Sequence, residues 1–213
     1  MGILSEKYKP YIRNKKFLIA VGEGFLILLT GVIITTLAII YATEKSSNSV
    51  TDIILNNIPV FDVDWLFVYA PLFYWLVIIV YLVCHPNKLP FSLKTIGIFL
   101  IIRSIFMSLT HLGPSPDQLQ IDVTGIFRVF TSGADLFFSG HAGLPFLMAL
   151  LFWDNKYLRL FFIFSSIFLG AVVLLGHMHY SIDVFAAFFI TYTIFHIAEK
   201  LFKKDRQIFM HGL

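Results

Sequence analysis

The sequence predicts an all-α protein built into a membrane, and three observations predict it. Hydrophobic residues make up 58% of the 213 residues, charged residues only 14%, and the mean hydropathy is +0.82. Soluble domains are about 45–50% apolar and about 25% charged. The apolar residues gather into long segments with polar residues between them. This composition disfavours a soluble domain, a disordered chain and a nucleic-acid-binding protein.

A membrane-spanning helix needs about 20 mostly apolar residues, because the hydrocarbon core of a bilayer is about 30 Å thick. The first three apolar segments are long enough to span it: 17–41, 65–84 and 95–112. Three further segments are shorter: 142–153, 160–175 and 184–202. We expect six spanning helices. The first segment is too long, and starts too far from the N-terminus, for a cleaved signal peptide.

Orientation follows from the lysines and arginines near the ends of the segments, which favour the cytosolic side. Thirteen of the 16 lie on one side, Lys88 and Lys94 among them. The other side holds Lys45 and Arg128, and Arg103 falls within a span. We therefore expect both termini in the cytosol and a non-cytosolic side made of the loops around 44–64, 113–141 and 176–183. The expected organisation is a basic N-terminus (1–16), a six-span membrane domain (17–202) and a basic tail (203–213).

Two motifs lie on the non-cytosolic side, each directly before an apolar segment. The first runs from Asp135 to His141 and reads D-L-F-F-S-G-H. The second runs from His177 to Asp183 and reads H-M-H-Y-S-I-D. Helix N-termini carry partial positive charge and unpaired N–H groups, which suits a phosphate. Because both motifs stand at such positions on one side, we expect them to form one site.

These residue types predict phosphoryl-transfer chemistry. His179 and Asp183 are spaced i, i+4, so they share a face if this stretch is helical. A carboxylate on Nδ1–H fixes the tautomer and leaves Nε2 of His179 as a nucleophile. His141 then serves as general acid and afterwards as general base. Ser139 and the backbone around Gly140 hold phosphate oxygens, since glycine lets the backbone approach closely.

The site needs no metal or other cofactor in this scheme. The single cysteine, Cys84, excludes a cysteine-rich zinc site and a disulfide framework. The fourth apolar segment, 142–153, has 12 residues and spans roughly 18 Å as a helix, less than the hydrocarbon thickness. We therefore expect His141 to lie about 10 Å below the outer surface if the inner end of this helix reaches the membrane boundary. A recessed site suits a lipid that arrives sideways from the bilayer.

The residues Ser139-Gly140-His141, followed about 40 positions later by His179 and Asp183, resemble the type-2 phosphatidic acid phosphatase superfamily. Within it, the D-x-x-F-S-G-H and H-x-H-Y-x-I-D-V patterns are more similar to the sphingomyelin synthase branch. The third apolar segment with Arg103 is also similar to that branch. The resemblance covers about residues 95–200. It implies a six-helix fold, a non-cytosolic site and a phosphohistidine intermediate.

The chain also departs from these patterns. Ala142 stands where the synthase branch has threonine, and Val173 stands where lipid phosphatases have arginine. The proline-rich motif of the branch is weak here, and its nearest match is Ile58-Pro59-Val60-Phe61-Asp62. A phosphomonoester is nearly dianionic and needs more fixed positive charge than a phosphodiester. The site side offers at most Arg128, Lys45 and Arg103, which favours a diester donor.

Other residues keep two interpretations at this stage. Asp135 either orients His141, binds a cationic headgroup or is a solvated loop carboxylate. Arg128, Arg103 and Tyr180 are further candidates for substrate binding, although we expect Arg103 to pair with Glu23, because intramembrane charges usually pair. His177 lies two residues from His179 and is expected to point elsewhere, in a supporting or structural role. The role of His111 is open between the site and an interfacial position.

Three functions therefore remain in view. The first is a transferase that moves a phosphodiester headgroup from a phospholipid donor to ceramide or another lipid alcohol. The second is a lipid phosphatase or phospholipase C-like hydrolase that uses the same histidines. The third is a membrane carrier, which would be expected to show repeated halves or broken helices at matching positions. The expected location is a bacterial inner membrane, or otherwise a Golgi or plasma membrane, with headgroup and oligomeric state left open.

Overall fold

The computed structural model describes residues 3–119 and 135–213, and over these residues the protein is helical with no strand. This confirms the predicted all-α class. The helices, in chain order, are α1 (Ile3–Arg13), α2 (Lys15–Lys45), α3 (Asp64–Cys84), α4 (Leu89–Leu109), α6 (Gly140–Leu151), α7 (Lys156–Leu175), α8 (Ser181–Leu201) and α9 (Lys203–His211). Two short 3₁₀ turns, Leu55–Asn57 and Pro86–Lys88, complete the described elements.

Five of the described helices are long and apolar enough to cross a membrane: α2, α3, α4 with the turn before it, α7 and α8. The chain is therefore a multi-pass membrane protein. The predicted fourth span is α6, which has only 12 residues and falls below the length of a full crossing. The count of six spans and the cytosolic placement of the termini stay predictions.

The observed boundaries differ from the predicted ones mainly at helix starts. α4 begins at Leu89, six residues before the predicted Thr95, because Pro90 fits the first turn of a helix. α7 begins at Lys156, where the Asn155 side chain accepts hydrogen bonds from the N–H groups of the first turn. Charged residues lie at or near the starts of both helices, so a prediction from apolar residues alone places the helix starts too late.

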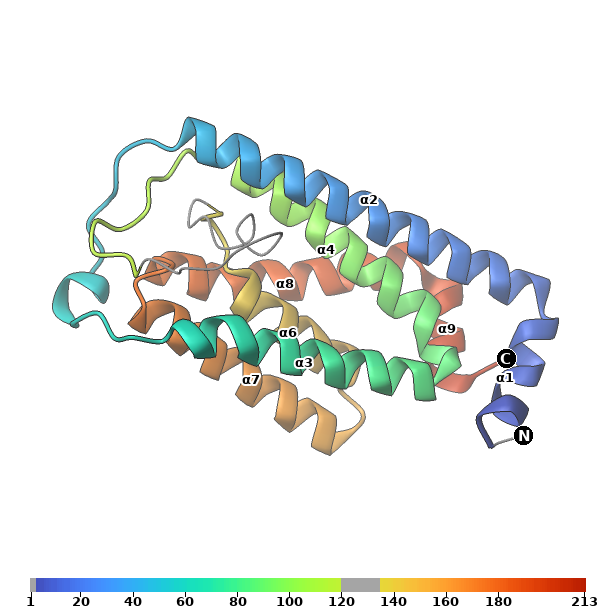
Figure 1. Ribbon diagram of the computed structural model, residues 1–213. Coiled ribbons are helices and arrows are strands. Elements are labelled where there is room, and N and C mark those ends of the chain that lie inside the picture. Colours follow the sequence, from blue (N-terminus) through green and yellow to red (C-terminus); the bar gives the residue numbers. More distant parts are fainter. Residues whose placement is uncertain (1–2, 120–134) are drawn as a thin grey trace.

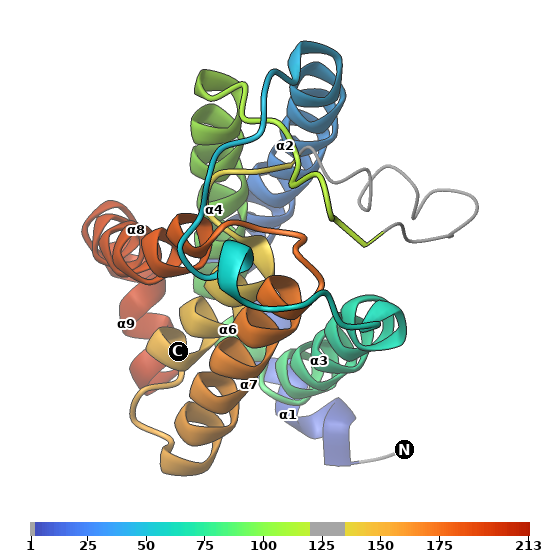
Figure 2. The same cartoon turned by 90° about the vertical axis from the view of Figure 1, so that its left-hand side faces the viewer.

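Figure 1 shows that both termini lie at one end of the bundle and that the loops before α3, after α4 and before α8 lie at the other. α6 contacts α4, α7 and α8, and Leu147, Met148 and Ala149 on it are fully buried. The short helix is thus the centre of the core. Figure 2, which looks onto the loop end, shows the longer helices around it. This arrangement puts the N-terminus of α6 at the loop end, where the two histidine motifs meet.

α2 and α4 pack with their backbones in contact along much of their length. Glycines make this possible. A Cβ added at Gly31 would lie 2.8 Å from the carbonyl oxygen of Gly97, and one added at Gly97 would lie 2.8 Å from the backbone of Ile27. Small residues that let backbones approach are typical of helix pairs in membranes. The α2–α4 pair is therefore fixed by main-chain contact.

The predicted ion pair between Glu23 and Arg103 is wrong. Glu23 pairs with Lys94, whose Nζ lies 2.6 Å from Oε2 of Glu23 and 2.8 Å from Oδ2 of Asp205. Lys94 is buried in α4, so it is not the cytosolic loop residue that the orientation count made it. The earlier start of α4 explains both errors, because it moves Lys94 into the helix and level with Glu23.

The segment predicted as a basic tail folds back onto the bundle as α9. Phe209 is buried against the core, and its carbonyl oxygen accepts hydrogen bonds from Asn87 and Lys88. Asp205 of the same helix holds Lys94. The end of the described chain therefore closes the end of the bundle opposite the histidine motifs.

Candidate active site

The two predicted motifs meet at the loop end of the bundle. The N–H of Ser139 donates a hydrogen bond of 3.0 Å to the carbonyl oxygen of Asp183, which joins the start of α6 to the start of α8. The ring centroids of His141 and His179 lie 6.4 Å apart, with an angle of 60° between the ring planes. The two imidazoles therefore lie close together between the start of α6 and the start of α8.

His179 and Asp183 are in contact, but not along a helix face. α8 starts at Ser181 with Tyr180 as its N-cap, so His179 precedes the helix and Asp183 lies in the first turn. Oδ2 of Asp183 accepts from the Tyr180 N–H at 3.1 Å and lies 3.2 Å from Nδ1 of His179. The carboxylate thus caps the helix and fixes the imidazole at once. With Nδ1 held, Nε2 of His179 carries the free lone pair.

His141 lies in the first turn of α6 and projects toward α3. Its ring packs on Phe67, with 4.4 Å between the ring centroids. Sequence reasoning did not find Phe67, because a single phenylalanine in an apolar helix carries no signal. The contact holds one face of the His141 ring, so the imidazole has a defined position opposite His179.

Two buried oxygens in this site have no hydrogen-bond partner among the described residues: Oγ of Ser139 and Oδ1 of Asp183. Ser139 is the N-cap of α6, yet its hydroxyl does not cap the helix. Buried polar atoms normally have partners. The Ser139 hydroxyl lies beside the N-terminal N–H groups of α6, and its role in phosphate binding stays a prediction.

Arg103 contacts the Ser-Gly-His segment instead of Glu23. Its Nη2 donates to Oδ2 and to the carbonyl oxygen of Asp135, both at 2.9 Å, and its Nε donates to the carbonyl oxygen of Phe138 at 3.1 Å. A Cβ added at Gly140 would lie 3.3 Å from this Nε, so glycine makes room for the guanidinium. Phe137 and Phe138 have positive φ angles of 68° and 28°, a costly conformation that the arginine stabilises.

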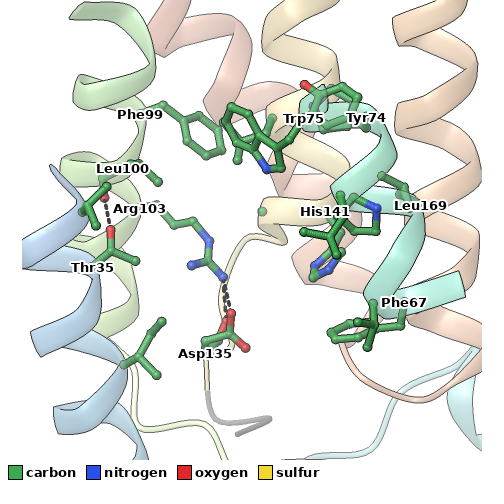
Figure 3. Close-up of a pocket in the computed structure, with 18 residues that line it drawn as sticks. Thr35, Phe67, Tyr74, Trp75, Phe99, Leu100, Arg103, Asp135, His141 and Leu169 are labelled. Atoms are coloured by element: carbon green, nitrogen blue, oxygen red, sulfur yellow. Dashed lines mark hydrogen bonds and ion pairs between the residues drawn. The ribbon is translucent and has the colours of Figure 1, made fainter. Parts of the chain in front are cut away.

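An apolar cavity of about 360 Å³ reaches this site from between α2, α3, α4 and α6. Figure 3 shows His141 on one side of it and the Arg103–Asp135 pair on the other. Val32 and Leu72 line the cavity and are also 41% and 42% exposed on the apolar surface. The cavity therefore connects His141 with the apolar surface of the bundle.

Tyr180, predicted to bind substrate, is buried, and its hydroxyl is already engaged. It donates to the carbonyl oxygen of Gly113 at 2.9 Å and accepts from the N–H of Val50 at 3.2 Å. The tyrosine thus ties together the loops before α3 and after α4. Because Tyr180 directly follows His179 in the chain, these two hydrogen bonds also hold the backbone next to His179 in place.

Asp52 is a site-supporting residue that sequence reasoning missed. Its Oδ2 accepts from both the N–H and the hydroxyl of Ser181 at 2.7 Å, and its Oδ1 accepts from the N–H groups of Ile54 and Leu55. Burial alone would raise the pKa of Asp52, but these hydrogen bonds outweigh it and lower the pKa. Asp52 and Ser181 are 129 positions apart, and no sequence motif in the loop before α3 predicts their contact.

The remaining candidates lie outside the histidine pair. His111 contacts Tyr41, whose hydroxyl lies 3.2 Å from its Nε2, where α2 and α4 reach the loop end of the bundle. Val173, at the position of the phosphatase arginine, is buried, and its carbonyl oxygen accepts the N–H of Met178. Arg128 lies outside the described residues. No cluster suited to a metal ion is found over 3–119 and 135–213, and metal-free chemistry stays a prediction.

The fold and site define a multi-pass membrane protein with two histidines facing a common gap. Residues 133–200 match the family described as PAP2 superfamily C-terminal. The matched stretch contains both histidine motifs, and the match supports membership of the type-2 phosphatidic acid phosphatase superfamily. This is consistent with a phosphatase or phosphotransferase acting on lipid phosphates. No curated protein and no solved structure matches the chain.

Proposed function

We propose that the protein is a headgroup transferase that moves a phosphodiester headgroup from a glycerophospholipid to ceramide or a similar lipid alcohol. The observation that carries this proposal is the position of His141, which lines an apolar cavity reaching the apolar surface of the bundle and whose ring centroid lies 6.4 Å from that of His179. This activity is the one that the resemblance to the sphingomyelin synthase branch implies.

The reaction runs in two halves. Nε2 of His179 forms a bond to phosphorus while the bond from phosphorus to the diacylglycerol oxygen breaks. His141 gives a proton to that oxygen, because an alkoxide is a poor leaving group. His141 then takes the proton from the acceptor hydroxyl, whose oxygen attacks phosphorus and releases His179. Asp183 keeps the His179 imidazole in one tautomer throughout.

Charge supports a diester donor over a monoester. Among the described residues that line the cavity, Arg103 is the one permanent cation, and it is paired with Asp135 at 2.9 Å. The pair adds no net charge to the site. A nearly dianionic monoester would face the Asp135 carboxylate with little compensation, whereas a monoanionic diester requires less. The Ser139 hydroxyl and the N-terminus of α6 suffice to hold its two non-bridging oxygens.

The apolar cavity supports a lipid acceptor over water. Its described lining is mostly aliphatic and aromatic, with Phe99, Trp75 and Leu169 among the walls in Figure 3. The chains of a diacylglycerol leave, and those of a ceramide arrive, through the same apolar space. Both substrates then place one oxygen next to His141, which lines that space.

The site is proposed to face the non-cytosolic side. Support comes from the distribution of lysine and arginine, which remains biased toward the end of the bundle that holds both termini. The bacterial inner membrane, with a periplasmic site, is the proposed location. The membrane domain over 17–202 is the proposed catalytic unit.

The test is a transfer assay with purified protein, fluorescent ceramide and vesicles that each contain one phospholipid donor. We expect a fluorescent ceramide phospho-headgroup product and equimolar diacylglycerol from the wild-type protein. His179→Ala removes both products, while His196→Ala, a histidine on α8 that is 44% exposed in its side chain, retains them. Release of phospho-headgroup into water at the same rate with and without ceramide would assign the protein as a hydrolase instead.

A further inference from the structure

A second cavity lies at the loop end, on the outer side of the histidine pair. Its volume is about 640 Å³, and it is formed by the loops before α3, after α4 and before α8. Unlike the apolar cavity, it has a lining rich in hydrogen-bonding side chains: Ser49, Thr51, Asn56, Ser115, Asp117 and His177. The site thus has an apolar cavity on one side and a polar cavity on the other.

His177 is the buried member of these six hydrogen-bonding residues. The residue is 4% exposed, and neither ring nitrogen has a hydrogen-bond partner among the described residues. Its backbone has a φ of 53°, in the left-handed region that non-glycine residues rarely adopt. A buried imidazole with two unsatisfied nitrogens costs free energy unless a ligand or water completes it. The position therefore has the character of a binding residue without its ligand.

The polar cavity lies close to the proposed nucleophile. His177 and His179 are two residues apart, so their Cα atoms are separated by at most about 7 Å. Tyr180, the neighbour of His179, lines the same cavity. His141 lines the apolar cavity and is absent from the lining of the polar one. His179 itself lines neither cavity, but it lies between a residue of each: its ring centroid is 6.4 Å from that of His141, and it follows His177 by two positions.

A phosphodiester donor likewise has an apolar part and a polar part on either side of its phosphorus. One ester oxygen carries the apolar glycerolipid and the other carries a polar alcohol. We propose that the polar cavity holds this headgroup alcohol during both half-reactions and that His177 recognises it by hydrogen bonding. The inference rests on the proposed function. Binding of the headgroup in the polar cavity explains how the headgroup stays in place while the glycerolipid is exchanged for the acceptor through the apolar cavity.

The lining specifies the chemical class of the headgroup. The Asp117 carboxylate, the Asn56 amide and the hydroxyls offer several acceptors for N–H and O–H groups. A quaternary ammonium group has no such donors and is bound by cages of several aromatic rings. Apart from the His177 imidazole, Tyr180 supplies the one aromatic ring of the described lining. The headgroup is thus a hydrogen-bond donor, a primary amine or a polyol, and not choline.

The first arm of the test compares donors that carry ethanolamine, glycerol, inositol or choline headgroups. We expect the wild-type protein to prefer one of the first three over choline by at least tenfold in kcat/KM. His177→Leu raises KM for that donor at least tenfold with kcat changed less than threefold. His177→Asn, which tolerates a positive φ, controls for the backbone. Asp117→Asn weakens an amine donor selectively and leaves a polyol donor nearly unchanged.

The second arm does not depend on turnover. Phosphoethanolamine, glycerol phosphate, inositol phosphate and phosphocholine are each added to the detergent-solubilised protein, and the melting temperature is measured. We expect one of the first three to stabilise the wild-type and His179→Ala proteins but not His177→Leu. If that occurs while no donor is turned over, the cavity assignment stands and the proposed function fails.

Two results would overturn the inference while leaving the transferase intact. One is transfer by His177→Leu with unchanged KM and unchanged donor ranking. The other is a preference for choline in both arms. Absence of turnover together with absence of stabilisation by all four compounds would overturn the function and the inference alike.

Discussion

Nδ1 of His179 lies 3.2 Å from Oδ2 of Asp183, and the two residues stand on opposite sides of the point where α8 begins. The same oxygen accepts the N–H of Tyr180, the N-cap residue. One carboxylate therefore sets both the start of the helix and the tautomer of the imidazole. The relationship makes the reactivity of His179 depend on a helix cap.

The first prediction concerns this pair. Asp183→Asn should lower kcat on the order of 10²- to 10⁴-fold, because the amide permits the wrong tautomer of His179. His179→Ala should abolish transfer and the trapping of donor headgroup on the protein. The measurement is acid-labile label on the protein after a rapid quench. His196→Ala serves as the matched control, and robust labelling of His179→Ala would exclude it as the nucleophile.

The second prediction concerns Arg103 and Asp135. Arg103→Met leaves a largely buried carboxylate and the Phe138 carbonyl without their donor, so unfolding free energy should fall by about 3–5 kcal/mol. The double variant with Asp135→Asn should lose less than the sum of the two single losses, with a coupling of about 1–3 kcal/mol. Denaturant unfolding of the four proteins measures this coupling. Strict additivity would contradict the pairing.

The third prediction concerns the buried lysine at the opposite end. Lys94 and Asp205 have side chains that are 5% and 10% exposed, whereas that of Glu23 is 57% exposed. Asp205→Asn should therefore destabilise the protein by about 3–5 kcal/mol. Glu23→Gln should cost no more than about 1 kcal/mol, because water screens the exposed pair. The reverse order of melting temperatures would refute this assignment.

The fourth prediction concerns pH. The pKa of Asp52 is lowered in the folded protein, so its carboxylate stabilises the fold fully above its unfolded pKa of about 3.9. This contribution disappears as the pH falls through the lower folded value. The stability difference between wild type and Asp52→Asn should therefore be constant above about pH 5 and shrink below about pH 4. Melting curves across pH measure it, with Asp62→Asn, an exposed neighbour, as the control.

The fifth prediction concerns sidedness. Ile53 lies in the loop before α3 and is 83% exposed, and Tyr157 lies at the start of α7 and is 85% exposed. In a Cys84→Ala background, a cysteine introduced at Ile53 should react with an impermeant thiol reagent on intact cells. One introduced at Tyr157 should react only after lysis. The opposite pattern would place the histidine pair on the cytosolic side.

The sequence indicated the helical class and both histidine motifs because each depends on local information. Apolar runs identify helices, and the spacing of His179 and Asp183 holds whether or not the helix starts before them. The long-range contacts were not predicted correctly. The pairing of Glu23 with Arg103 rested on the tendency of intramembrane charges to pair, and the true start of α4 puts Lys94 in the helix as the partner of Glu23 instead.

Asp52 and His177 show why the rest of the site was not predicted. Asp52 acts on Ser181 through a loop fold that no short-range pattern encodes. His177 is predicted from the sequence to have a supporting or structural role, because it lies two residues from His179. Its left-handed backbone turns it into the loop cavity instead. Loop conformation thus decides the roles of residues whose types were visible in the sequence.

The glycine contact between α2 and α4 has a consequence for substrates of different width. Two walls of the apolar cavity belong to that pair, whose backbones touch at Gly31 and Gly97 and cannot move apart without losing the contact. α3 forms the facing wall, and it shares no such backbone contact through glycine with α2 in the described structure. A displacement of α3 that admitted a bulkier pair of lipid chains would also move the Phe67 ring that packs on His141. The width of the cavity and the position of the His141 ring thus depend on the same helix.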